Sequence, residues 1–173
     1  VTGIKSFMKC NIYNNSPVIF GNVFHDFHDI IDSYLMQITH NVDEILIQNN
    51  TFSGFTSQMF SGGGIAINFI NIKDTIFTFI FDNCSFNENV NSNSADMNGN
   101  GILGYNFEDD SINNARIEIN KCNFLRNECL HGNGGAIYIH NDNDISISNC
   151  LFENNNCVEG KGGAIFIGNS NND

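Results

Sequence analysis

The chain has 173 residues, 41% of them hydrophobic and 15% charged, which suffices for one folded domain and excludes a disordered chain. Its net charge of −12, with seven Lys and Arg, excludes a basic surface, so we expect no nucleic-acid partner. No apolar run approaches the roughly 20 residues that a membrane-spanning helix needs, so we expect no membrane insertion.

The first 40 residues carry the weakest pattern. Residues 7–12 read as a degenerate copy of the repeat found further on, with Ile12 in the place of a Phe. Residues 16–40 break from that repeat, so we expect residues 1–40 to form an irregular first coil with an insertion. The insertion contains His25, Asp26, His28 and Asp29. Imidazole and carboxylate groups bind metals, so a metal site is the alternative to a purely structural polar insertion.

Four later segments share the pattern apolar-x-apolar-x-x-(Cys/Asn)-x-Phe. They are residues 45–52, 79–86, 117–124 and 145–152. The alternation places both apolar side chains on one face of a strand. A second motif, based on Gly-Gly-Ala-Ile, begins ten residues after Phe52, Phe124 and Phe152, and about four residues later than that after Phe86. Each repeat therefore supplies at least two short strands separated by Gly- and Asn-rich turns.

The repeat decides the expected architecture. The markers at 12, 52, 86, 124 and 152 are 40, 34, 38 and 28 residues apart, which fits a constant coil with loop insertions. Neither strand of a coil buries its apolar face alone, whereas stacked coils do. The sequence predicts an all-β fold, a right-handed single-stranded parallel β-helix of about five coils, similar to the pectin-lyase-like solenoids. We expect one such segment over residues 1–173, as part of a longer protein.

The two motifs together resemble the repeats of chlamydial polymorphic outer membrane proteins and of similar surface proteins in bacteria and protists. Phe-x-x-Asn occurs at 86–89, 124–127 and 152–155, and Gly-Gly-Ala-Ile at 134–137 and 162–165. The resemblance implies an extracellular or cell-surface β-helix that acts in adhesion rather than catalysis. The Asn predicts a ladder along the solenoid, in which each Asn tolerates left-handed backbone and bonds its own turn.

The six cysteines fall on two repeat positions. Cys10, Cys84, Cys122 and Cys150 lie two residues before the Phe position, and Cys129 and Cys157 lie five after it. Neighbouring coils stack about 4.8 Å apart, within the range for disulfide Cα atoms. Cys129–Cys157 or Cys122–Cys150 between coils, Cys122–Cys129 or Cys150–Cys157 within a coil, and buried free thiols all stay open.

Acidic residues cluster between the second motif and the next repeat. They are Asp43, Glu44, Glu108, Asp109, Asp110, Asp142 and Asp144. We expect a solvated acidic edge, with weakly bound calcium as the alternative and no other cofactor. Glycosidases need two carboxylates across a cleft, and no such constellation is evident, so we expect no enzyme. Sequons at Asn14, Asn49 and Asn83 permit N-glycosylation in a eukaryotic secretory pathway.

The preferred function is an extracellular or cell-surface structural and adhesive module, with a host or matrix surface as partner. One alternative is a filament subunit, in which other copies or chains stack on the helix ends, because the sequence after Gly168 provides no evident cap. Another is a carbohydrate-binding or polysaccharide-degrading β-helix with a cleft where loops converge.

Overall fold

The computed structural model describes ten stretches of the chain. They are residues 6–12, 18–25, 30–31, 34–40, 42–58, 67–71, 77–92, 103–105, 115–139 and 144–168. Over these residues the protein is all-β, with 21 strands and no helix, and every strand pairing is parallel. The predicted all-β class with parallel sheets is confirmed.

Three of the sheets have five strands. The first sheet contains β2 (Val18–Phe20), β6 (Glu44–Gln48), β10 (Phe77–Asp82), β14 (Ala115–Asn120) and β18 (Asp144–Ser148). The second contains β3 (Val23–His25), β7 (Thr51–Ser53), β11 (Ser85–Asn87), β15 (Asn123–Leu125) and β19 (Leu151–Glu153). The third contains β4 (Ile30–Ile31), β8 (Thr56–Gln58), β12 (Val90–Asn91), β16 (Glu128–Cys129) and β20 (Asn156–Cys157).

Two further sheets have three strands each. The fourth contains β1 (Ser6–Ile12), β5 (Tyr34–His40) and β9 (Ile67–Asn71), and the fifth contains β13 (Leu103–Tyr105), β17 (Ile137–Ile139) and β21 (Ile165–Ile167). Because β9 also contacts β13, the fourth and fifth sheets continue one another.

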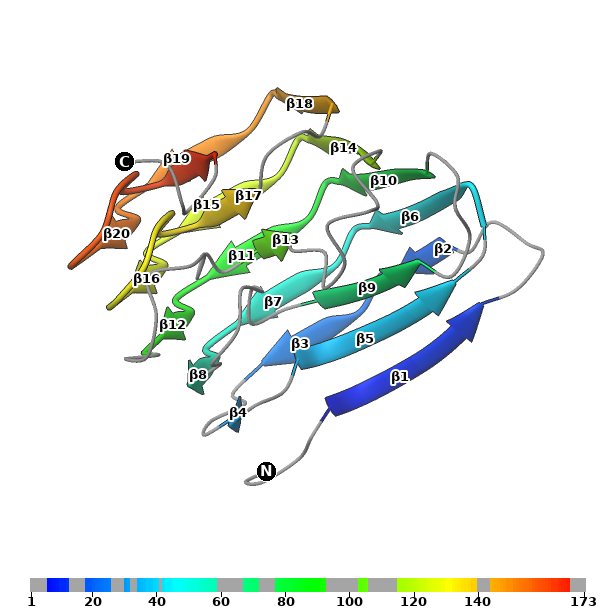
Figure 1. Ribbon diagram of the computed structural model, residues 1–173, viewed down its shortest axis with the longest axis horizontal. Helices are drawn as coiled ribbons and strands as arrows, with labels where there is room; N and C mark the ends of the chain where they lie inside the picture. Colours follow the sequence, from blue (N-terminus) through cyan, green and yellow to red (C-terminus); the bar gives the residue numbers. More distant parts are fainter. Residues whose placement is uncertain are drawn as a thin grey trace.

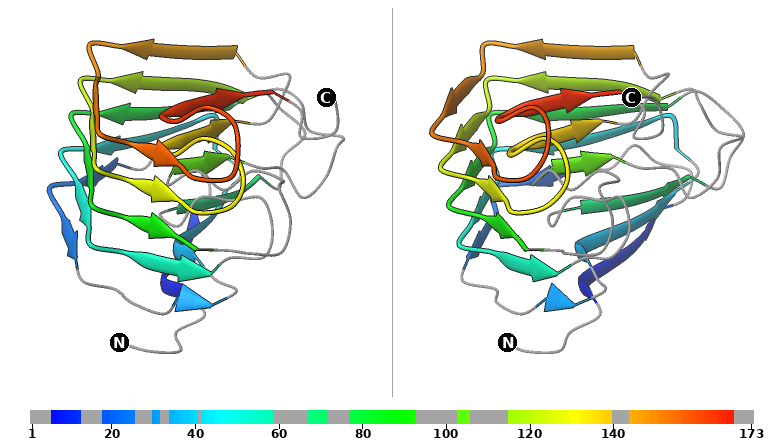
Figure 2. Two further views of the ribbon diagram at one scale, coloured as in Figure 1. Left: turned by 90° about the vertical axis from the view of Figure 1, so that its left-hand side faces the viewer. Right: turned by 60° about the vertical axis from the view of Figure 1, so that its left-hand side comes forward.

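The chain visits the sheets in a fixed order. After β1 it passes five times through the first, second and third sheets and then through the fourth or fifth. We call each set of four strands a round, so that round 1 is β2–β5 and round 5 is β18–β21. Strands of successive rounds lie side by side along the molecule (Figure 1), and the end-on views show the rounds layered on one another (Figure 2).

The strand register agrees with most of the repeat alignment. Phe52, Phe86, Phe124 and Phe152 are Cα partners from round to round, as the pattern predicts. Leu103 pairs with Ile137, which confirms that the degenerate second motif of round 3 comes four residues late.

The first 40 residues differ from the prediction. Residues 7–12 are not a copy of the first motif, because Cys10 pairs with Ile38 in the fourth sheet. Phe24 is the partner of Phe52 and therefore holds the Phe position of round 1. The described strands within residues 18–40, β2 to β5, visit the sheets in the same order as the strands of later rounds. Gly21 occupies the left-handed turn position that Asn49 holds in round 2, so the two turns share a backbone conformation.

Inward side chains form continuous stacks through the core. The rings of Phe86 and Phe124 stack with centroids 4.8 Å apart, and Phe52 and Phe152 extend the stack at 4.9 Å on either side. Alternate residues of the first sheet, among them Ile45 and Ile47, are buried against this stack. The ring spacing equals the spacing of adjacent strands, so equivalent rings of successive rounds stack in parallel.

Candidate functional site

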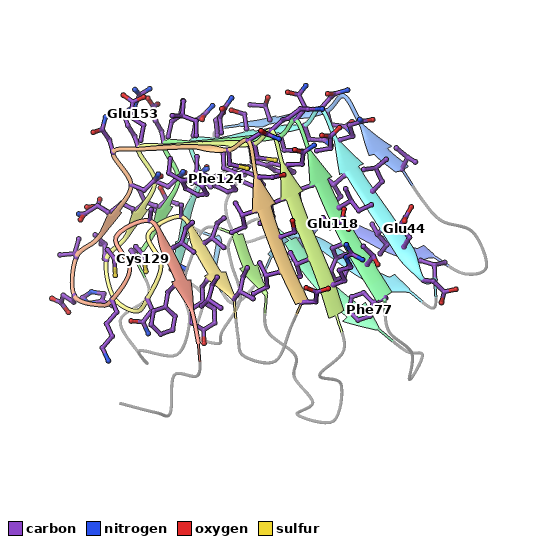
Figure 3. All side chains as sticks on the ribbon, turned by 90° about the horizontal axis from the view of Figure 1, so that it is seen from above. Glu44, Phe77, Glu118, Phe124, Cys129 and Glu153 are labelled. Atoms are coloured by element: carbon purple, nitrogen blue, oxygen red, sulfur yellow. The ribbon has the colours of Figure 1, made fainter. Side chains whose placement is uncertain are left out.

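The outer face of the first sheet carries a hollow of about 440 Å³. Strand alternation creates it, because the residues between the buried positions of β6, β10, β14 and β18 point outward. Leu46 and Ile80 give it an apolar part. A row of polar side chains beside them consists of Gln48, Asp82, Asn120 and Ser148. Figure 3 shows this face, with Glu44 and Glu118 labelled on its strands.

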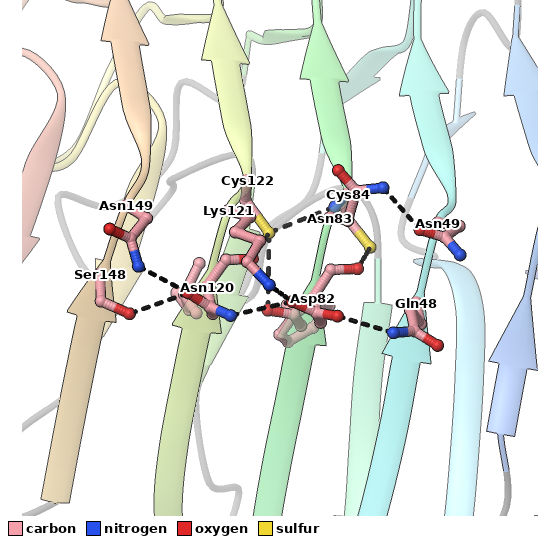
Figure 4. Close-up of polar contacts among 12 residues, drawn as sticks. Gln48, Asn49, Asp82, Asn83, Cys84, Asn120, Lys121, Cys122, Ser148 and Asn149 are labelled. Carbon is pink, nitrogen blue, oxygen red and sulfur yellow. Dashed lines mark hydrogen bonds and ion pairs between the residues drawn. The ribbon is translucent and has the colours of Figure 1, made fainter.

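Hydrogen bonds join the polar row across four rounds (Figure 4). Gln48 Nε2 donates to Asp82 Oδ2 at 2.6 Å, and Asn120 Nδ2 donates to Asp82 Oδ1 at 2.9 Å. Ser148 Oγ donates to Asn120 Oδ1 at 3.1 Å. Lys121 Nζ lies 4.0 Å from Asp82 Oδ1. Both oxygens of the Asp82 carboxylate are therefore engaged by neighbouring rounds, which makes it a structural acceptor.

Charged side chains border the row. Arg116 Nε lies 2.9 Å from a carboxylate oxygen of Glu118 and 3.8 Å from one of Asp144. The Arg116 and Asp144 side chains are 54% and 77% exposed, so these ion pairs contribute little to stability. They give the face both signs of charge. Sequence reasoning missed this face, although the fourth position of each repeat segment is a hydrogen-bonding residue in all four copies.

A ladder of asparagines runs inside the turn between the second and third sheets. Asn127 is fully buried; its Nδ2 donates to the carbonyl oxygen of Phe86 at 2.8 Å, and its Oδ1 accepts the backbone N–H of Asn89 at 3.2 Å. Asn155 repeats this pattern one round later.

The predicted Asn ladder is thus present, but its expected bonding was wrong. Each Asn bonds the preceding round rather than its own turn, because the carbonyl of the neighbouring Phe lies within reach. The left-handed residues are instead the ones before it, Glu88, Arg126 and Asn154.

Cysteines take the same bonding role in the turn between the first and second sheets. The Cys84 N–H donates to Cys122 Sγ at 3.4 Å, and Cys84 Sγ donates to the carbonyl oxygen of Ile47 at 3.3 Å. Asn50 occupies this row in round 2, where its Oδ1 accepts the N–H of Asn22 at 3.0 Å. The hydrogen bond with Cys84, together with burial, raises the pKa of Cys122. These thiols act as buried hydrogen-bonding groups.

The cysteines proposed to form disulfides carry free thiols in this structure. The structure describes the side chains of Cys84, Cys122, Cys129, Cys150 and Cys157, and all of these are free thiols. Cys129 and Cys157 are Cα partners on adjacent strands of the third sheet. Cys122 bonds the carbonyl oxygen of Asn120 before β15, whereas Cys129 bonds that of His131 after β16, so the structure does not bring this within-coil pair together.

The structure describes only some of the residues that were candidates for metal binding or N-glycosylation. Asp26, His28 and Asp29 lie outside the described residues, and His25 ends β3. In the part of the chain that is described, no group of three or more His, Cys, Asp or Glu side chains is placed to hold a metal ion.

The sequon residue Asn14 also lies outside the described residues. Asn49 and Asn83 occupy equivalent turns of adjacent rounds, and Asn83 Nδ2 donates to Asn49 Oδ1 at 2.6 Å. The acidic residues Asp43, Glu44 and Asp144 are exposed.

No family model, no curated protein and no solved structure matches this chain. Within the residues described, no helix has the length and apolar character to cross a membrane.

Proposed function

We propose that the chain is a right-handed, single-stranded parallel β-helix that serves as a rigid, non-enzymatic structural and adhesive module outside the cell or at its surface. The register of the rounds carries this proposal, because Phe, Asn and Cys side chains stack on their equivalents from one round to the next. Solenoids of this kind are stiff rods with extended binding surfaces. The right hand is favoured because crossovers between parallel strands of one sheet are almost always right-handed.

The carboxylates of the outer face support a non-enzymatic role. A general base must lie within hydrogen-bond reach of the substrate and be directed at it. Asp82 is instead oriented by Gln48 and Asn120, and Glu118 by Arg116. These groups hold the face together and present amide, hydroxyl and charged groups to a partner.

We assign attachment to the outer face of the first sheet. It combines apolar Leu46 and Ile80 with a polar row at a regular spacing of about 4.8 Å per round. The partner would be a host or matrix surface, as the resemblance of the repeats implies.

The test is attachment of beads that carry the chain to matrix-coated and cell-covered surfaces under flow. The double variant Leu46→Asp, Ile80→Asp should reduce attachment at least tenfold, because it places two charges in the hollow. The matched control is Val90→Asp, Leu125→Asp, which adds the same charges on outward, half-buried positions of the third and second sheets. Equal losses in both variants, or no attachment by the unaltered chain, would contradict the proposal.

The hollow also favours a second candidate, binding of a neutral polysaccharide. Sugar rings present hydroxyl groups at their edges and C–H groups on their faces, which suit an amide row beside Leu46 and Ile80. Calorimetric titration with soluble neutral polysaccharides should then show binding that Asn120→Ala weakens about tenfold, the loss of about one hydrogen bond. No heat of binding from any of them would remove this candidate.

A further inference from the structure

Two thiols lie next to each other in the third sheet. Cys129 on β16 and Cys157 on β20 are directly opposed Cα partners. Adjacent parallel strands are about 4.8 Å apart, which falls within the 4.4–6.8 Å that disulfide Cα atoms span. Cys129 Sγ donates to the carbonyl oxygen of His131 at 3.1 Å, and Cys157 Sγ donates to that of Gly132 at 2.9 Å. Because these carbonyls are consecutive in one turn, both sulfurs lie on the same side of the sheet.

The surroundings of this pair differ from those of the other cysteines. Its row continues to Asn91 in round 3, so neither thiol has a third cysteine as a competitor. In the other row Cys122 lies between Cys84 and Cys150, and its sulfur bonds the Cys84 N–H and two carbonyls.

Access also favours the pair in the third sheet. Cys129 is fully buried, whereas Cys157 is partly exposed and so reachable by a small oxidant. Gly160 passes close by: a Cβ there would lie 2.9 Å from Cys157 Sγ and 1.4 Å from the carbonyl oxygen of Gly132. Only glycine fits at this position, and it lets the turn of round 5 pass close to the Cys157 sulfur.

We propose that Cys129 and Cys157 form a modification site, oxidised to a disulfide that links rounds 4 and 5 by exchange with a small disulfide of the glutathione class. The Cys157 thiolate attacks one sulfur of the oxidant, and one glutathione thiolate leaves. The Cys129 thiolate then attacks the Cys157 sulfur of the mixed disulfide, and the second glutathione leaves. Two electrons pass to the oxidant, and each departing thiolate takes up a proton lost by a cysteine. The inference rests on the proposed extracellular location, where such oxidants persist.

The bond would secure round 5, in which several apolar side chains are exposed. Leu151, Val158 and Ile167 of round 5 are 48%, 52% and 52% exposed, and Phe152 is only partly buried, although its partner Phe124 is fully buried. A covalent link to round 4 limits the fraying of these strands and shields the turn that contains Lys161.

The experiment equilibrates the reduced, folded chain in glutathione buffers of increasing oxidation and maps peptides without reduction. We expect the loss of two hydrogen masses, located to a peptide pair that joins Cys129 to Cys157. Tryptic cleavage after the exposed Lys161 should become about tenfold slower on oxidation. The variant Cys157→Ala should abolish both effects. The control Cys150→Ala changes a partly exposed cysteine of the same round and should keep both.

A bond between any other pair, glutathione that stays attached to Cys157, or thiols that stay reduced in the most oxidising buffer would overturn the inference. Circular dichroism of each variant checks that it is folded. Failure of this inference is distinguishable from failure of the proposed function. A chain that forms the bond and does not attach to surfaces contradicts the function alone, whereas a chain that attaches and never forms it contradicts the inference alone.

Discussion

Single side chains in this molecule act by closing hydrogen bonds between rounds. The fully buried Asn127 donates to a backbone carbonyl of round 3 and accepts a backbone N–H of round 3 through its side-chain oxygen. A buried polar group without a partner costs about 1–3 kcal/mol, so these contacts weigh more than exposed ion pairs such as Arg126 with Glu88.

The Asn ladder makes a direct prediction about stability. Asn127→Ala leaves one carbonyl and one N–H unpaired in the interior, so we expect unfolding free energy to fall by about 2–4 kcal/mol. Chemical denaturation followed by circular dichroism measures this loss. Asn123→Ala, an exposed position four residues earlier, should change it by less than about 0.5 kcal/mol. Equal losses in the two variants would show that the buried amide has no special role.

The buried thiols predict a dependence of stability on pH. Burial, and then the neighbouring Cys157, raises the pKa of Cys129 from an ordinary value of 9.0 to about 12. A raised pKa in the folded state means that the thiol's contribution is complete below pH 9 and is lost as the pH rises toward 12. Urea denaturation of the reduced chain should show stability falling over this range, and Cys129→Ser should flatten the fall. A Cys129→Ser profile as steep as that of the unaltered chain would contradict this assignment.

At the scale of strands, much of the arrangement is readable from the sequence. The alternation in residues 79–86 and 117–124 gives both the strands and their mutual register, because the apolar side chains of the two segments face the core together only in this register. The repeat of round 1 could not be recognised by residue identity. Its turn reads Gly21-Asn22, where rounds 3 and 5 have Asn-Cys.

The candidate face could be predicted only in part. The alternation alone places Gln48, Asp82 and Asn120 outward in one row. Their mutual hydrogen bonds depend on rotamers, which no spacing specifies. The direction of the Asn side chains was missed for the same reason.

Equivalent Phe residues should contribute unequally to the free energy of unfolding, according to their place in the stack. Phe124 lies between Phe86 and Phe152 and is fully buried, so Phe124→Ala should cost about 3–5 kcal/mol. Phe152 stacks on Phe124 and is only partly buried, so Phe152→Ala should cost about half as much. Thermal or chemical unfolding of both variants measures the difference. A larger loss for Phe152→Ala would contradict the stacking order.

At the scale of the whole molecule, the rounds form a stack in which the strands of each round pair with those of its neighbours. The partner of every described strand belongs to an adjacent round, or is β1 beside round 1. Paired residues are therefore about one round apart in the sequence. Rounds 1 and 2, and again rounds 4 and 5, are offset by 28 residues, whereas insertions lengthen the offsets between them to 34 and 38. The pairing of the described strands is therefore kept although the number of residues between equivalent strands varies.

The register of the Phe stack is the central claim, and nuclear Overhauser contacts between aromatic side chains test it most directly. With phenylalanine-selective labelling, cross-peaks should connect Phe52 to Phe86, Phe86 to Phe124 and Phe124 to Phe152, in the order of the rounds. Absence of these contacts, or contacts that instead join antiparallel neighbours within one repeat, would contradict the stacked parallel arrangement and the functions proposed from it.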